Sequence, residues 1–375
     1  MDALMLPLNW QRVRLGDIGK PCMCKRVMKH QTTRYGEIPF YKIGTFGNIA
    51  DAFISKKLFL EYKTKYSFPK KGDILISASG TIGRAVIYDG KPAYFQDSNI
   101  VWIDNDETLV KNDFLFYAYS NVKWNTEHTT ILRLYNDNFR NTLIPLPPPN
   151  EQNAIANILS DLDRYLCALD ALILKKEGVK KALSFELLSQ RKRLKGFNQA
   201  WQKVRLGDIC EITTGSLDAN EMVHYGKYRF YTCAKEYYFI DKYAFDTEAI
   251  LISGNGAYVG YVHYYKGKFN AYQRTYVLDN FSEHIIFVKY FLTMFLQSHI
   301  QTNRNEGNTP YIVMATLKDF EILLPPLNEQ SAIANILSDL DNEITSLKNK
   351  KRQFENIKKA LNHDLMSAKI RVLEK

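Results

Sequence analysis

The sequence predicts a mixed α/β protein with an internal twofold repeat, in which two globular α/β domains alternate with two long helices. Three observations predict this architecture. Two motifs each occur twice in the same order, short apolar runs end at glycine turns, and two long stretches carry apolar residues at spacings of three and four. With 375 residues, the chain is also longer than one ordinary domain.

The repeat is defined by its two motifs. Trp-Gln-Arg-Val-Arg-Leu-Gly-Asp-Ile at residues 10–18 recurs with one change 191 residues later, at 201–209. Pro-Pro-x-Asn-Glu-Gln-x-Ala-Ile-Ala-Asn-Ile-Leu-Ser-Asp-Leu-Asp at 147–163 recurs 178 residues later, at 325–341. The order is therefore A–B–A′–B′, and we place the segments at 1–148, 149–197, 198–326 and 327–375. The B segments match far better than the A segments, which predicts a shared role for B and B′ and different targets for A and A′.

The B segments are predicted to be long helices that pair with each other. Asn150 and Asn328 follow prolines and are suitable helix N-caps. The apolar positions of the B segments repeat about every 3.5 residues, as in a coiled coil, and keep matching registers. They are Leu162, Leu166, Leu169, Leu183 and Leu187 in B, and Leu340, Ile344, Leu347, Phe354, Leu361 and Leu365 in B′. The alternative is that each helix packs only on its own globular domain.

The A segments are predicted to contain many short strands. Residues 74–77 and 250–253 are short apolar runs, each followed by a glycine turn and a second strand-like run, which is a hairpin pattern. The first copy carries about 14 more residues than the second before this strand, judged from the spacing of the repeated segments. This extra stretch is rich in lysine: Lys56, Lys57, Lys63, Lys65, Lys70 and Lys71.

The positive charge is concentrated in one segment. The whole chain has a net charge of +10, and residues 1–71 alone have a net charge of +9, whereas residues 198–326 have −1. A concentrated basic segment is typical of phosphate contact, although a solvated surface would show it as well. No apolar run is long enough to span a bilayer and no signal peptide is evident, so we expect a cytoplasmic protein.

Patterns typical of catalysis or metal binding are missing from the sequence. The glycine turn at 254–260 leads into a strand rather than a helix, so it does not match a phosphate-binding loop. Cys22 and Cys24 have no second Cys/His pair at zinc-ligand spacing, and we expect reduced thiols and no metal. No nucleophile elbow, base-methylation motif or helicase motif occurs. The two aspartates of each pair, 161/163 and 339/341, point about 200° apart on a helix, so we expect solvated helix positions or partner contacts rather than acid–base chemistry.

The two duplicated motifs and the A–B–A′–B′ order resemble the specificity (S) subunits of Type I restriction-modification systems. The resemblance covers nearly the whole chain. It implies that A and A′ are target recognition domains for the two halves of a split DNA site, and that B and B′ are spacers pairing as an antiparallel coiled coil. It also implies two methyltransferase (M) subunits that bind S-adenosylmethionine, and restriction (R) subunits that use ATP. This chain itself would then be no enzyme and would hold no cofactor. Separately, the exposed seams of the B helices suggest association with M subunits, or self-association when M is absent.

DNA-contacting residues do not transfer from the resemblance, because recognition domains vary. Base edges are bound by Arg, Lys, Asn and Gln, and phosphates by Lys and Arg. On that basis, the candidates in the first domain are Lys25, Arg26, Lys29, Arg34, Lys42, Lys56, Lys57 and Arg84. Those in the second domain are Lys227, Arg229, Lys235, Arg274, Asn303, Arg304, Asn305 and Asn308. The alternative function is a coiled-coil scaffold that binds proteins without recognising a DNA sequence.

Overall fold

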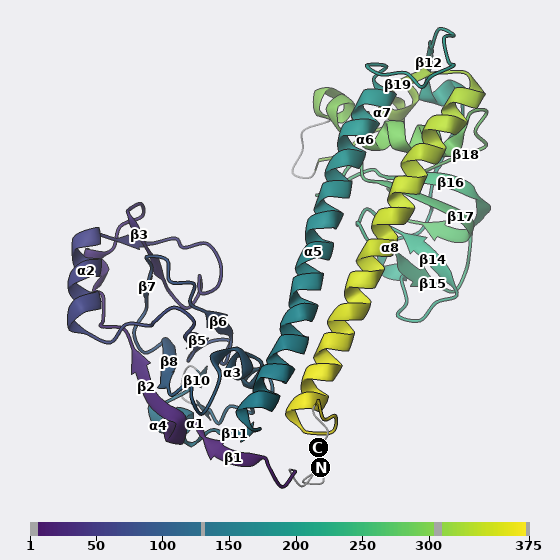
Figure 1. Ribbon diagram of the computed structural model, residues 1–375. Coiled ribbons are helices and arrows are strands. Elements are labelled where there is room, and N and C mark those ends of the chain that lie inside the picture. The colour runs from purple at the N-terminus through teal and green to yellow at the C-terminus, as the bar shows by residue number, and fades with distance from the viewer. Residues whose placement is uncertain (1–6, 129–131, 304–309, 373–375) are drawn as a thin grey trace. The chain divides into compact units, whose positions relative to one another are not determined.

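The computed structural model describes residues 7–128, 132–303 and 310–372. The chain forms two compact units, one made of residues 1–170 and 350–375 and the other of residues 171–349. The long helices α5 (Pro149–Leu188) and α8 (Leu327–Met366) each contribute to both units, and each unit has one globular α/β domain (Figure 1). The predicted α/β fold class with its internal repeat is confirmed.

Within the described residues, the globular domain of the first unit contains two small sheets and two further antiparallel strand pairs. Antiparallel β1 (Gln11–Arg14) and β11 (Leu143–Leu146) pair directly before α5. One sheet has the order β2 (Gly19–Met23), β8 (Ile100–Asn105), β5 (Ile74–Ser77), β6 (Ala85–Ile87), and the other has the order β4 (Phe53–Ile54), β3 (Ile38–Tyr41), β7 (Tyr94–Phe95). The remaining elements are α1 (Leu15–Ile18), η1 (Lys29–Gln31), α2 (Lys56–Lys65), α3 (Asn112–Tyr119), β9 (Glu127–His128), β10 (Leu132–Arg133) and α4 (Asn136–Asn141).

The globular domain of the second unit repeats this plan with one larger sheet. Antiparallel β12 (Gln202–Arg205) and β19 (Glu321–Leu324) correspond to β1 and β11. The six-stranded sheet has the order β13 (Glu211–Thr214), β18 (Thr275–Asp279), β16 (Phe245–Ser253), β17 (Val262–Ala271), β14 (Tyr228–Tyr231), β15 (Tyr238–Ile240). The helical elements are η2 (Leu206–Asp208), η3 (Ala219–Glu221), α6 (Ile285–Asn303) and α7 (Met314–Lys318).

Both predicted hairpins are present. β5 pairs antiparallel with β6, with Ile74 opposite Ile87, and β16 pairs antiparallel with β17. The lysine-rich insertion of the first domain forms α2, which Ser55 caps by accepting a hydrogen bond from the Leu58 N–H. Phe59 on α2 is buried, so the helix packs on the core while its lysines stay in water.

Each globular domain shares its core with the helices. In the first unit, Trp10 and Phe114 pack in one cluster with Leu159 of α5 and Leu365 of α8. In the second unit, the corresponding cluster joins Phe287 of α6 to Leu187 of α5 and Leu337 of α8. Burial of each such side chain stabilises the fold by about 1.5–3 kcal/mol. The shared cores therefore attach each globular domain to both helices.

The two long helices pair antiparallel within each unit. In the first unit, the Tyr165 and Phe354 rings lie 4.7 Å apart and Lys351 Nζ lies 2.6 Å from Asp170 Oδ1. In the second unit, Lys176 Nζ lies 2.8 Å from a Glu343 carboxylate oxygen. Residue numbers rise along α5 while those of their partners fall along α8, so the pairing predicted for the B segments is confirmed. Of the predicted seam, the positions that are buried are Leu169, Leu187, Ile344 and Leu365, and the other positions are partly buried.

The prediction for both helix starts is wrong by two residues. α5 begins at Pro149 and α8 at Leu327, so Asn150 and Asn328 lie inside the first turn rather than capping it. The carbonyl of Pro148 accepts hydrogen bonds from the Glu151 and Gln152 N–H groups. Proline suits this end of a helix because it lacks an N–H that would be left unpaired. Among the helices of the described residues, none is long and apolar enough to cross a membrane.

Candidate nucleic-acid interface

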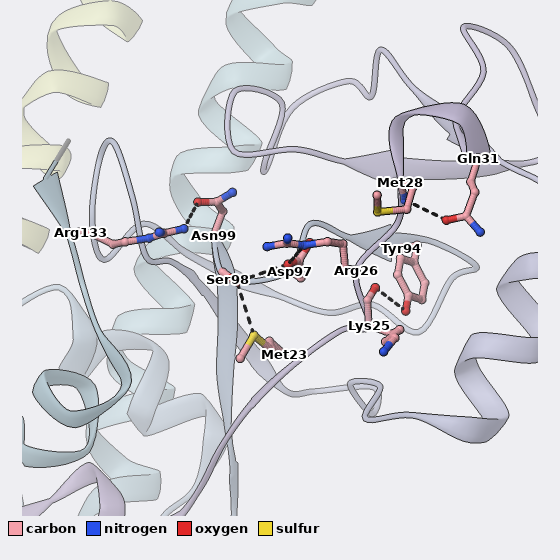
Figure 2. Close-up of polar contacts among 10 residues, drawn as sticks. All are labelled: Met23, Lys25, Arg26, Met28, Gln31, Tyr94, Asp97, Ser98, Asn99 and Arg133. Carbon is pink, nitrogen blue, oxygen red and sulfur yellow. Dashed lines mark hydrogen bonds and ion pairs between the residues drawn. The ribbon is translucent and has the colours of Figure 1, made fainter. Parts of the chain in front are cut away.

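The loop between β2 and β3 presents basic side chains of the first domain. Four predicted residues are exposed there: Lys25, Arg26, Lys29 and Arg34. Their backbone is held in place, since the Met28 N–H donates to Gln31 Oε1 at 2.8 Å and the Tyr94 hydroxyl donates to the Lys25 carbonyl at 3.1 Å (Figure 2). A fixed loop with exposed cationic side chains is suited to phosphate contact.

Arg26 is the only one of these four with a described carboxylate partner. Its Nε lies 2.9 Å from Asp97 Oδ2, and 67% of the Arg26 side chain is exposed (Figure 2). Because the Arg26 guanidinium is largely in water, a phosphate can compete with Asp97 for it. Lys25 Nζ lies 5.0 Å above the Tyr66 ring, which leaves its ammonium group hydrated.

The other four predicted residues of the first domain lie outside this loop. Lys42 Nζ pairs with Asp51 at 2.8 Å, and Arg84 Nη2 donates to the Gly47 carbonyl at 3.3 Å. Lys56 and Lys57 are exposed in the first turn of α2. No described contact joins these four to the loop at 25–34, so they do not form one cluster with it.

Two residues that the sequence did not single out extend the basic loop. Asn99 Oδ1 accepts a hydrogen bond from Arg133 Nη2 at 3.4 Å (Figure 2). The same oxygen accepts a second hydrogen bond from Ser79 Oγ at 2.8 Å. Asn99 follows Asp97, the partner of Arg26, by two residues, so Arg133 lies near the same surface. Aligning the strands at 100–105 and 275–279 would have placed Asn99 at the position of the candidate Arg274.

In the second domain, the candidates have different environments. Lys227 and Arg274 are exposed, and Lys235 Nζ lies 5.1 Å above the Tyr258 ring. Asn303 is the last residue of α6. The candidates Arg304, Asn305 and Asn308 lie outside the described residues.

Arg229 is held by aromatic rings rather than by an acid. Its guanidinium lies 4.3 Å from the Tyr237 ring centre and 4.4 Å from that of Tyr265, and it donates to the Tyr231 hydroxyl at 3.3 Å. Stacking on two rings leaves the edge of the guanidinium available for hydrogen bonds. Burial lowers the pKa of His263, whose ring packs on that of Tyr231.

A buried glutamate at the start of each long helix joins three parts of its unit. In the first unit, Glu151 accepts hydrogen bonds from Trp10 Nε1 at 3.0 Å and from Arg371 Nε at 2.7 Å. Trp10 belongs to the opening motif and Arg371 follows α8. The motif, α5 and the end of α8 are therefore held together at one carboxylate.

The second unit repeats this junction with the helices exchanged. Glu329 of α8 accepts hydrogen bonds from Trp201 Nε1 at 3.2 Å and from Arg193 Nε at 3.1 Å. Arg193 follows α5 and is the counterpart of Arg371. Each glutamate side chain is at most 2% exposed. Both duplicated motifs thus serve the same contact, which explains why they are the best-matched parts of the repeat.

One aspartate of each pair, Asp163 and Asp341, contacts side chains of neighbouring elements, whereas Asp161 and Asp339 are exposed. Asp163 accepts hydrogen bonds from the Tyr117 hydroxyl at 2.8 Å and from Lys358 Nζ at 2.5 Å. The corresponding groups in the second unit also meet: Asp341, Tyr290 and Lys180. Burial alone would raise the pKa of Asp341, but the hydrogen bonds from Lys180 and Tyr290 outweigh it and lower that pKa.

Among the described residues, no group of three or more His, Cys, Asp or Glu side chains lies close enough to hold a metal ion. Cys24 is buried, and burial raises the pKa of its thiol to about 12. Cys22 lies beside it in sequence and its pKa is raised too, chiefly by burial. Both thiols therefore stay protonated at neutral pH.

Known proteins match this chain over both repeats. The profile described as "Type I restriction modification DNA specificity domain" matches residues 7–176 and 198–356. A putative type I restriction enzyme specificity subunit of Haemophilus influenzae is 61% identical over 152 residues, which cover 40% of this chain and 40% of that protein. The EcoDI specificity subunit of Escherichia coli is 40% identical over 162 residues, or 42% of this chain and 35% of that protein. These matches span less than half of each relative's length.

Other matches extend over the whole chain. The MjaVIII specificity subunit of Methanocaldococcus jannaschii is 26% identical across 99% of this chain and 95% of its own length. The crystal structure of the S subunit of a type I restriction-modification system from M. genitalium has a TM-score of 0.65 at 18% identity, and covers 97% of this chain and 98% of that one. At this identity the structural match supports the fold alone.

Proposed function

The chain belongs to the family of type I restriction-modification DNA specificity proteins, and from this premise we propose that it recognises a split, asymmetric site in double-stranded DNA. Each globular domain would bind one half of the site. The observation that carries this proposal is the repeated junction, in which Glu151 and Glu329 attach one recognition domain each to the same pair of helices. A frame with two equivalent attachments and two different domains suits two different half-sites.

The two domains differ in the charge that they bring to DNA. The first 71 residues have a net charge of +9, whereas residues 198–326 have −1. Phosphate attraction supplies most non-specific affinity, so the first domain contributes more of the salt-dependent binding. The second domain would rely on base contacts from residues such as Arg229 and Arg274, with attraction supplied by the first domain and the partners.

We infer that this chain positions catalytic partner subunits on DNA and catalyses no reaction itself. Two M subunits that carry S-adenosylmethionine would dock on it, and R subunits that use ATP would join through them. Apolar side chains on the helices support such docking, because they are exposed on the chain alone: Ile158, Leu172, Leu174, Val179 and Ile357. Without M subunits, the same residues would favour self-association.

The test is co-expression of the full chain with an M subunit of its restriction system in a host that lacks adenine methylation. Sequencing that detects methylated bases should find adenine methylation at one asymmetric bipartite motif. The alternative function, a coiled-coil scaffold that binds only proteins, predicts no methylated motif and no sequence preference in DNA binding. An intact complex of the two chains that binds all duplexes equally would favour that alternative.

A further inference from the structure

In each globular domain, three chain segments meet through the same backbone hydrogen bonds. In the first domain, the Ala78 N–H donates to the Asn99 carbonyl at 2.7 Å, and the Leu134 N–H donates to the Ala78 carbonyl at 2.8 Å. Ser79 and Arg133 also form an isolated β-bridge. The three segments are separated along the chain by about twenty residues or more, so the strand pairing alone brings them together.

The second domain reproduces the arrangement bond for bond. The Gly254 N–H donates to the Arg274 carbonyl at 2.8 Å, and the Ile312 N–H donates to the Gly254 carbonyl at 2.9 Å. Asn255 and Tyr311 form the matching bridge. The equivalent positions of the two domains are therefore Ser79 and Asn255, Asn99 and Arg274, and Arg133 and Tyr311.

These equivalent positions share a backbone but not side chains. Each domain has one guanidinium among the three, on the third segment in the first domain (Arg133) and on the second segment in the other (Arg274). The backbone hydrogen bonds already hold the segments, so the side chains are not needed for that task. Two domains with different base preferences would be expected to share this backbone arrangement and to differ in the polar side chains that it carries.

In the first domain, the guanidinium is oriented by Asn99. The Asn99 Oδ1 atom accepts from both Ser79 and Arg133, which occupies its two lone pairs. Most of the Arg133 N–H groups have no other partner within the described part of the chain. The neighbouring Ser98 has a φ of 59°, in the left-handed region that residues other than glycine disfavour. Such local strain is typical of functional positions.

In the second domain, the guanidinium is presented on a fixed backbone. The Arg274 carbonyl accepts hydrogen bonds from the Gly254 N–H and from Cys233 Sγ at 3.2 Å. A Cβ atom on Gly254 would lie 2.3 Å from that carbonyl oxygen, so glycine permits the close approach. The Arg274 side chain is exposed and makes no hydrogen bond or ion pair within the described residues.

Resting on the DNA-recognition function proposed above, we propose that Arg133 and Arg274 are the specificity-determining residues of the two half-sites. Each would bind the O6 and N7 edge of a guanine in the major groove, which is the contact that a guanidinium fork fits best. Asn99 acts as the positioning residue of Arg133. Because the two guanidinium groups come from different segments, the guanines would stand at different positions within their half-sites.

The experiment selects bound duplexes from a library randomised in both half-sites, using the full chain in complex with its M subunit. Arg133→Ala should reduce the preference for guanine at one position of one half-site by about 5- to 150-fold, the range of a bidentate base contact. Arg274→Ala should do the same in the other half-site only. The matched controls Arg12→Ala and Arg205→Ala remove exposed arginines from β1 and β12 and should leave both preferences unchanged.

Further variants separate base recognition from other roles. Arg133→Lys keeps the charge but not the fork, so it should retain the salt dependence of binding while losing most of the guanine preference. Asn99→Asp keeps an oxygen acceptor for Ser79 and Arg133 and should preserve the preference, whereas Asn99→Leu should weaken it. If Arg133→Ala instead weakened DNA binding equally on all sequences and lowered the salt slope by about one, Arg133 would be a phosphate contact and the proposal would be overturned. If the unaltered complex selects no sequence at all, the proposed function itself fails.

Discussion

Removing the Glu329 carboxylate should destabilise the second unit far more than removing a surface carboxylate. Glu329 is 1% exposed and receives two hydrogen bonds from Arg193 and one from Trp201. In the Glu329→Ala variant these donors lose their acceptor. Breaking a buried ion pair from one side costs about 3–5 kcal/mol. The Arg193 side chain is 27% exposed and can be partly rehydrated, which favours the lower end, about 3 kcal/mol.

Hydrogen exchange of the full chain measures this loss unit by unit, because global unfolding of a chain with two compact units need not be a two-state process. A loss of about 3 kcal/mol corresponds to amide protection in the first turns of α8 that is lower by about 100-fold. Glu321→Ala is the matched control, because it removes a carboxylate that is 55% exposed and pairs with Lys203. That surface pair contributes no more than about 1 kcal/mol.

Two outcomes decide whether the junction works as described. The equivalent variant Glu151→Ala should lower protection in the first unit by a similar factor, since Trp10 and Arg371 lose their acceptor there. Equal protection in Glu329→Ala and Glu321→Ala would refute the argument that the buried carboxylate stabilises the attachment of the second domain. Glu329→Gln retains an acceptor oxygen and should lose only about 1–2 kcal/mol.

Three further results are expected. Replacing the exposed Lys25, Lys29 and Arg34 by alanine should lower the salt slope of DNA binding by about three. The matched control replaces three lysines on the exposed face of α8 by alanine: Lys348, Lys350 and Lys359. If the control lowered the slope equally, the assignment of phosphate contact to the first domain would be contradicted. Inserting four residues into the middle of both α5 and α8 lengthens each helix by about 6 Å and should lengthen the preferred gap between half-sites by about two base pairs. The same insertion in α5 alone should weaken DNA binding. Cys24, whose pKa burial raises to about 12, should resist iodoacetamide at pH 8 in the folded chain while the exposed Cys167 reacts. Because a raised pKa in the folded state favours the protonated thiol, the contribution of Cys24 to stability should fall as the pH rises above about 9, as urea unfolding at pH 8 and pH 10 would show.

The helices and the hairpins were predictable because their signals are local. The spacing of Leu162, Leu166 and Leu169 marks one face of a helix wherever that helix packs, and the run at 74–77 before a glycine turn marks a strand in the same way. The exact start of α5 was missed because Asn150 and Pro149 both suit a helix N-terminus, and only the backbone geometry distinguishes N-cap from first turn.

The candidate interface was only partly predictable. Composition pointed to Lys25 and its neighbours because cationic residues are concentrated in this part of the sequence. It gave no reason to choose Arg133, which stands in a segment of the chain with a net negative charge, or Asn99, which is not charged at all. Conversely, Arg229 was a fair candidate by type, but the two tyrosine rings that hold it come from β17 and from residues just before β15.

By itself, the sequence determined the twofold repeat, the two long helices, the α/β character of the domains and the family, because duplicated motifs and periodic apolar residues carry that information along the chain. Tertiary structure alone decided which side chains meet. Glu151 and Arg371 are bonded although 220 positions separate them, and Ser79, Asn99 and Arg133 share one point through the pairing of three segments. Such meetings depend on strand register and on the antiparallel order of the helices, which arise from the packing of the whole domain rather than from any local stretch.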